Sequence, residues 1–219
     1  MEAVLQEIPA PFADVASDRD DTPRLLAIRR RILTVAKHKI ARFGFEAVSL
    51  QDIAHSADLP WDEFQEHFAD KPAVLHAILE QGWRELLPRL EDAARNSISA
   101  RNGLLSVFAV MTNLMQRDED LVRIMLWEGR RPDPESGLLE VTGGYRRFVQ
   151  VCTELVVQGQ HDGSVKANLH PRVMASLLIG ALDGLLRDRL IAEQEDTITP
   201  FTGSYLISAY DALVSGLKI

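Results

Sequence analysis

The residues best suited to chemistry in this sequence are basic side chains between residues 24 and 43. Arg29, Arg30 and Arg31 stand in succession, and the segment contains no acidic residue. Guanidinium groups present forked donors that match phosphate oxygens, so three arginines without acidic neighbours indicate contact with phosphates. A helix face that is simply solvated is the alternative interpretation of the same charges.

Patterns typical of catalysis or metal binding are not found. The sequence has no glycine-rich phosphate loop, no HExxH and no GxSxG motif, so we expect neither an enzyme nor a cofactor. The six histidines lack the spacing of metal ligands, and no metal site is expected. The single cysteine, Cys152, excludes an internal disulfide and lies on an apolar helical face, which favours a core residue over a redox sensor.

Length and composition limit the possible classes of protein. A chain of 219 residues, of which 46% are hydrophobic, can bury one large core or two small ones. The net charge of −8 argues against general affinity for nucleic acid but permits a local basic patch. No apolar stretch reaches the roughly 20 residues of a membrane span, and the N-terminus does not resemble a signal peptide. We therefore expect a cytoplasmic protein with no membrane partner.

Hydrophobic periodicity predicts an all-α fold. Residues 24–43 predict a long first helix, and Ser49 is a suitable N-cap for a short helix over about 50–56. The sequence Asp58-Leu59-Pro60 ends that helix, and a third helix is predicted over about 60–67. Two short helices joined by a tight turn after a longer helix are typical of a helix-turn-helix.

The segment 47–71 resembles the N-terminal domain of TetR-family transcription regulators, over about a quarter of the chain. This resemblance implies a helix-turn-helix DNA-binding domain at 24–71 and a helical bundle at 72–219 that binds a ligand and dimerises, with about nine helices in all. The residues that carry it are Ile32, Ala36, Ile40, Gly44, Ser49, Ile53, Ala54, Ala57, Phe68 and Lys71. Residues 1–23, with six acids and one arginine, predict a flexible acidic tail.

The expected DNA contacts combine phosphate and base recognition. Gln65 could pair with adenine and Trp61 could meet a thymine methyl group, while Ser49 could bind a phosphate or only cap its helix. Asp62, Glu63 and Glu66 depart from the family pattern, because carboxylates near phosphates are repelled. The candidate DNA-binding residues are Arg29, Arg30, Arg31, Ser49, Gln51, Pro60, Trp61, Gln65, His67 and Lys71.

The helices after residue 72 supply candidates for a ligand cavity and a dimer interface. Methionine and aromatic side chains at helical spacing could line an apolar pocket or simply form the core. Two leucine-rich stripes near the C-terminus suit a four-helix dimer interface, or else face the intrachain core. The ligand-binding candidates are Phe108, Met111, Met115, Trp127, Phe148, Cys152 and Met174, and the dimer candidates are Leu178, Leu182, Leu185, Leu206, Tyr210 and Leu213.

Together these features lead to the hypothesis of a cytoplasmic, homodimeric transcription regulator of the TetR type. The resemblance implies a repressor that a small apolar effector releases from a palindromic double-stranded operator. The alternative is a protein of the same fold that binds a small molecule or a lipid and has lost operator binding, since the expected recognition helix and the tail are acidic.

Overall fold

The computed structural model describes residues 23–130, 137, 141–165, 169–195 and 201–216. The predicted acidic tail, apart from Pro23, lies outside these ranges. The described residues form helices and no strand, which confirms the predicted all-α class. The helices are α1 (Pro23–Phe43), α2 (Leu50–Ser56), α3 (Trp61–Gln65), α4 (Lys71–Arg95), α5 (Ala100–Arg117), α6 (Glu119–Trp127), α7 (Gly143–Asp162), α8 (Pro171–Gln194) and α9 (Gly203–Gly216).

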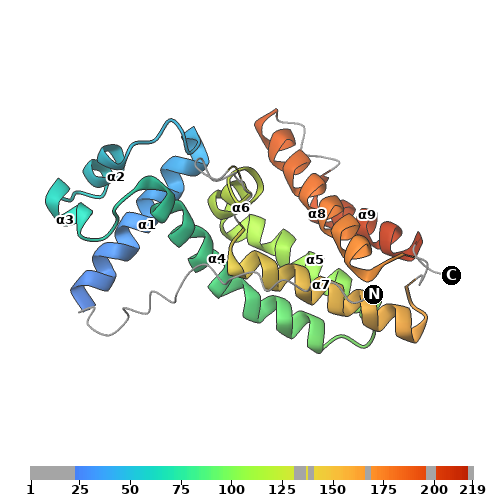
Figure 1. Ribbon diagram of the computed structural model, residues 1–219. Helices are drawn as coiled ribbons and strands as arrows, with labels where there is room; N and C mark the ends of the chain where they lie inside the picture. The colour runs from blue at the N-terminus through green and yellow to red at the C-terminus, as the bar shows by residue number, and fades with distance from the viewer. Residues whose placement is uncertain (1–22, 131–136, 138–140, 166–168, 196–200, 217–219) are drawn as a thin grey trace.

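Two hydrophobic cores organise these helices. We call α1–α3 the head and α5 and α7–α9 the body, and Figure 1 shows the two joined by α4 and α6. The head core is built on buried Ile32, Ile53 and Phe64, while Phe108 and Leu182 lie in the body core. Helix α4 gives side chains to both cores, so the predicted domain division at residue 71 stays a prediction.

Local sequence determines where the head helices begin and turn. Ser49 Oγ accepts the backbone N–H of Asp52 at 3.0 Å, and the Asp52 carboxylate accepts the N–H of Ser49 at 3.1 Å, which completes a capping box. Asp58, between α2 and α3, has a left-handed backbone with φ of 53°. The predicted turn therefore forms with aspartate, although α3 ends at Gln65 rather than near residue 67.

Helix α6 packs into both cores. Its Leu121 and Ile124 are buried in the head core, whereas Val122 is buried in the body core. A salt bridge and a hydrogen bond join the start of α6 to α1: Lys37 Nζ lies 2.5 Å from Asp118 Oδ2, and His38 Nδ1 lies 2.9 Å from Asp120 Oδ2. The head is thus attached to the rest of the chain along α6 as well as through α4.

Asp183 lies within the apolar sequence of α8 and pairs with Arg130, which follows α6. Arg130 Nη2 donates to Asp183 Oδ2 at 2.6 Å, and the guanidinium also lies 4.8 Å from the centroid of the Tyr145 ring. Burial raises the pKa of the Asp183 carboxyl, and the positive charge of Arg130 opposes that shift. No described helix is long and apolar enough to cross a membrane.

Replacing Asp58 by glycine should stabilise the head, because glycine adopts the left-handed backbone without a Cβ clash. We expect the unfolding free energy to rise by about 1 kcal/mol and Tm by about 2–4 °C in thermal unfolding followed by circular dichroism. Asp58→Val should shift Tm the other way. Equal melting of all three proteins would show that the turn is not strained.

Replacing Arg130 by methionine should leave the Asp183 carboxylate without its salt-bridge partner, although the Asp183 side chain is only 14% exposed. We expect urea unfolding to show a loss of about 2–3 kcal/mol. The double variant Arg130→Met/Asp183→Leu should recover most of that loss, because no charge is then left unpaired. Losses that add in the double variant would contradict a direct interaction between the two side chains.

Candidate functional sites

Helix α3, the predicted recognition helix, presents a polar face to solvent and an aromatic face to the head core. Phe64 is fully buried, whereas Asp62, Gln65 and Glu66 are exposed. Trp61 is partly buried, with its ring stacked on Phe64 at a centroid distance of 5.6 Å. Gln65 is therefore free to meet a base edge, while Trp61 also has a packing role that sequence reasoning missed.

Ser49 and Gln51 are exposed at the start of α2, and Pro60 is exposed just before α3. The Ser49 hydroxyl already donates to Asp52 Oδ2 at 2.6 Å, and its hydrogen bonds lower the pKa of the Asp52 carboxyl. A phosphate would have to displace that carboxylate to receive the hydroxyl proton. The capping role that the sequence predicted for Ser49 is formed without DNA.

The four Arg and Lys residues among the DNA-binding candidates fall into two groups. Arg30 and Arg31 are exposed, and no carboxylate within the described ranges pairs with either side chain. Arg29 and Lys71 are instead only partly exposed and contact backbone carbonyls and aromatic rings of the head. Residues 23–71 carry eight Lys or Arg and seven Asp or Glu, so the head is close to neutral in a chain of net charge −8.

His67 follows α3 and lies beside Arg29. Its backbone carbonyl accepts a hydrogen bond from Arg29 Nη1 at 3.2 Å. The side-chain Nε2 is buried, and no described residue gives it a hydrogen-bond partner. The structure thus brings these two predicted DNA-binding residues together, at the end of the recognition helix.

Most candidate ligand-binding residues lie together inside the body. Phe108 stacks on Tyr210 with ring centroids 4.1 Å apart, and burial raises the pKa of the Cys152 thiol to about 12. Trp127 is the exception, because it is 46% exposed at the end of α6. The residues that share the body core are Phe108, Met111, Met115, Phe148, Cys152 and Met174.

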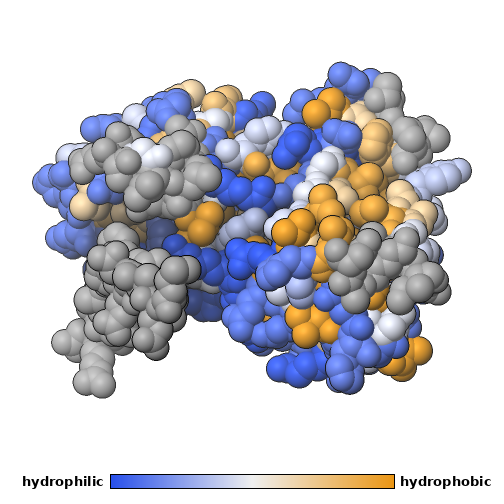
Figure 2. Space-filling view, turned by 45° about the vertical axis from the view of Figure 1, so that its right-hand side comes forward, coloured by the Kyte–Doolittle hydropathy of each residue, from blue (hydrophilic) through white to orange (hydrophobic). Residues whose placement is uncertain are grey.

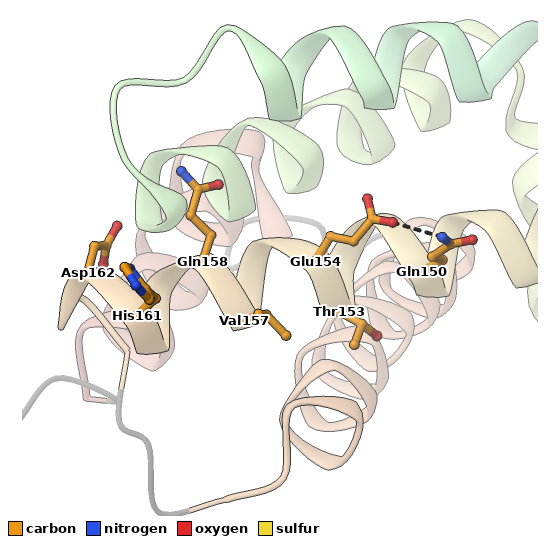
Figure 3. Close-up of a pocket in the computed structure, with 7 residues that line it drawn as sticks. All are labelled: Gln150, Thr153, Glu154, Val157, Gln158, His161 and Asp162. Atoms are coloured by element: carbon orange, nitrogen blue, oxygen red, sulfur yellow. Dashed lines mark hydrogen bonds between the residues drawn. The ribbon is translucent and has the colours of Figure 1, made fainter.

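The cavities found among the described residues lie elsewhere. A surface groove of about 660 Å³ runs along α7, and Figure 3 shows the seven side chains that line it, from Gln150 to Asp162. A second hollow of about 50 Å³ lies between α1, α4 and α6. No candidate ligand-binding residue lines either one, so an apolar ligand in the body core would have to displace packed side chains.

The dimer candidates divide between the core and the surface. The chain itself buries Leu178, Leu182, Leu206 and Tyr210, which removes them from reach of a partner, and Leu185 is half-buried. Of the six, Leu213 is exposed. The leucine stripes of α8 and α9 therefore face the intrachain core, the alternative that the periodicity left open.

Other apolar residues of the same helices are exposed. Figure 2 shows hydrophobic surface on its right-hand side, where α8 and α9 lie. An added Cβ on Gly180 or Gly184 would meet nothing within 4 Å, so no described helix of this chain needs those glycines for close approach. Among the exposed apolar residues of these helices, Val173, Leu177 and Ile191 lie on one side of α8, whereas Tyr205, Ile207 and Leu213 lie around α9. We define the α8–α9 face by the three residues of α8.

Proteins of similar sequence are transcription regulators. The chain is 21% identical over 189 residues to the fatty acid metabolism regulator protein of Bacillus subtilis, covering 85% of this chain and 94% of that protein. It is 22% identical over 178 residues to the HTH-type transcriptional repressor DhaR of a Mycobacterium species, covering 80% of this chain and 88% of that protein. No protein-family model matches the chain.

Solved structures show the same arrangement of helices. FadR from Bacillus subtilis in complex with stearoyl-CoA superposes with a TM-score of 0.71 at 17% identity, over 86% of this chain and 97% of that one. AibR in complex with isovaleryl coenzyme A and operator DNA gives a TM-score of 0.64 at 20% identity, over 87% of this chain and 98% of that one. Other structures of this fold are TetR-family regulators. The chain therefore has the fold of the TetR-family transcription regulators.

Proposed function

We propose that this chain is a homodimeric, ligand-responsive transcription regulator that represses by binding a palindromic DNA operator. The observation that carries the proposal is a helix-turn-helix whose α3 exposes Gln65, on a head that also exposes Arg30 and Arg31 and shares helices with an apolar body. Similar regulators of known structure bind acyl-CoA, and one of them was solved with operator DNA. No catalytic role is proposed.

Recognition of the operator's base sequence would depend on the exposed face of α3. Gln65 suits a bidentate contact with adenine, and a carboxylate such as Asp62 can accept from cytosine N4. Asp62 and Glu66 also oppose phosphates, so the affinity for non-specific DNA should be low relative to that for the operator. In a dimer, the two α3 helices would enter successive major-groove turns, roughly 34–36 Å apart.

The effector we propose is an apolar acyl chain, carried as an acyl-CoA thioester. The body core offers methionines that adapt to apolar ligands, and in this structure Phe108 and its neighbours fill that space. Binding would therefore rearrange the core rather than fill an existing cavity. Because α6 lies in both cores, a shift of Val122 would also move Leu121 and Ile124, and with them the head.

The α8–α9 face is proposed to be the dimer interface. Leu177, which is 56% exposed on this face, would be buried against the partner, so Leu177→Glu should convert the protein from a dimer to a monomer in sedimentation velocity. Ile98→Glu is the matched control, because Ile98 is 92% exposed in the α4–α5 connection. A Leu177→Glu variant that remains dimeric would move the interface to another face.

Operator binding can be tested by fluorescence anisotropy with DNA from upstream of the protein's own gene and with a scrambled duplex. Removing two exposed arginines, in Arg30→Met/Arg31→Met, should weaken binding to both duplexes. The slope of log K against log salt should become shallower by about 0.9 for each phosphate that the variant no longer neutralises. Arg84→Met/Arg89→Met, on the exposed surface of α4, should leave binding unchanged.

Stearoyl-CoA added to the same samples should release the operator. Equal affinity for operator and scrambled DNA, together with binding of the acyl-CoA, would favour the alternative of a ligand-binding protein without an operator. An unchanged salt slope after removal of Arg30 and Arg31 would instead assign the phosphate contacts to other residues.

A further inference from the structure

Two cations hold the two ends of the helix-turn-helix. At its far end, Arg29 of α1 reaches across to the residues that follow α3. Its Nη1 donates to the His67 carbonyl at 3.2 Å, and the guanidinium carbon lies 4.4 Å from the centroid of the Phe68 ring. Phe68 is buried, so this contact fixes the end of α3 against α1.

At the near end, Lys71 of α4 makes the same kind of contact with the residues that precede α2. Its Nζ donates to the carbonyls of Phe45 at 2.8 Å and Glu46 at 3.3 Å, and it lies 4.5 Å from the centroid of the Phe45 ring. The backbone N–H of Phe45 in turn donates to Glu128 Oε1 at 3.2 Å, after the end of α6. The start of the motif is therefore held from α4 and α6 together.

These contacts hold both cations against the protein itself in the absence of DNA. Each charged group is directed at a backbone carbonyl and an aromatic face, and both residues are partly buried. A phosphate bound to Lys71 would have to share the ammonium, because two of its three N–H donors are already directed at carbonyls. The side chains of Arg30 and Arg31, in contrast, are exposed to solvent.

We propose that Arg29 and Lys71 are positioning residues that clamp the helix-turn-helix at both ends and so determine its sequence specificity. This inference rests on the proposed function, because specificity has meaning only for a protein that reads DNA. Helices α2 and α3 have seven and five residues, too few to hold an orientation by themselves. Base recognition depends on that orientation, whereas attraction to phosphates depends mainly on charge.

The test compares Arg29→Met and Lys71→Met with Arg31→Met, because methionine keeps much of the aliphatic length and removes the charge. Anisotropy is measured for operator and scrambled DNA across a series of salt concentrations. Loss of either clamp should lower the ratio of operator affinity to scrambled affinity about tenfold, since misplaced α3 contacts affect the operator alone. The salt slope for scrambled DNA should stay as in the wild type. Arg31→Met should lower both affinities equally and flatten that slope.

Hydrogen exchange of the DNA-free protein provides an independent measurement. Loss of a clamp should speed exchange of the amides in α2 and α3 while those of α7 and α8 keep their protection, which also shows that the body is folded. Lys71→Arg, unlike Lys71→Met, should keep the slow exchange of the wild type, because arginine can also donate to the carbonyls. A residue that only binds phosphate would leave exchange in the free protein unchanged.

The outcomes separate the clamp from the proposed function. If Lys71→Met and Arg29→Met behave as Arg31→Met does in the salt series and leave exchange unaltered, the clamp is wrong and both residues bind phosphate. If the wild type does not prefer its operator, the proposed function fails, and hydrogen exchange alone then decides whether the two cations hold the motif.

Discussion

The structure depends on the burial of α6 in two hydrophobic cores at once. Leu121 and Ile124 complete the head core, and Val122 completes that of the body, so neither core can close fully without this helix. The fit is close on the α4 side, where an added Cβ on Gly82 would lie 2.6 Å from the Leu121 side chain. Packed cores resist gradual deformation, and in the proposed mechanism a change in the body would reach the head as a shift of α6.

The basic residues of the head differ in what they contact, according to their positions. Arg29 and Lys71 contact the motif itself, Lys37 and His38 contact α6, and Arg30 and Arg31 face solvent. Arginine therefore makes contacts within the protein on one side of α1, and on another side it remains available to bind an anion. A near-neutral head on an acidic chain favours recognition through a few placed contacts over a broad electrostatic attraction.

The packed body has a consequence for ligand binding. Aromatic stacking between Phe108 and Tyr210 occupies the region that we propose for an apolar effector, so the contacts of such a ligand would have to offset the loss of this stacking. A ligand that needs this stack opened would bind the rearranged body more tightly than the packed one, and such a difference in affinity is what lets a ligand shift the equilibrium between two states. The adaptable side chains Met111, Met115 and Met174 lie in the same core.

The sequence by itself determined the helical class, the N-cap at Ser49, the turn that begins at Asp58 and the family resemblance, because caps, turns and periodicity depend on neighbouring residues. It did not determine which of two apolar faces of α8 points inward, so Leu178 and Leu182 were expected at an interface that Leu177 suits better. The sequence likewise could not distinguish the role of Arg29 from that of Arg30. Nor could it predict that Lys71 contacts the carbonyl of Phe45 or that Asp183 pairs with Arg130. Those pairings join residues 26 to 53 positions apart, and only the packing of helices against one another brings such residues together.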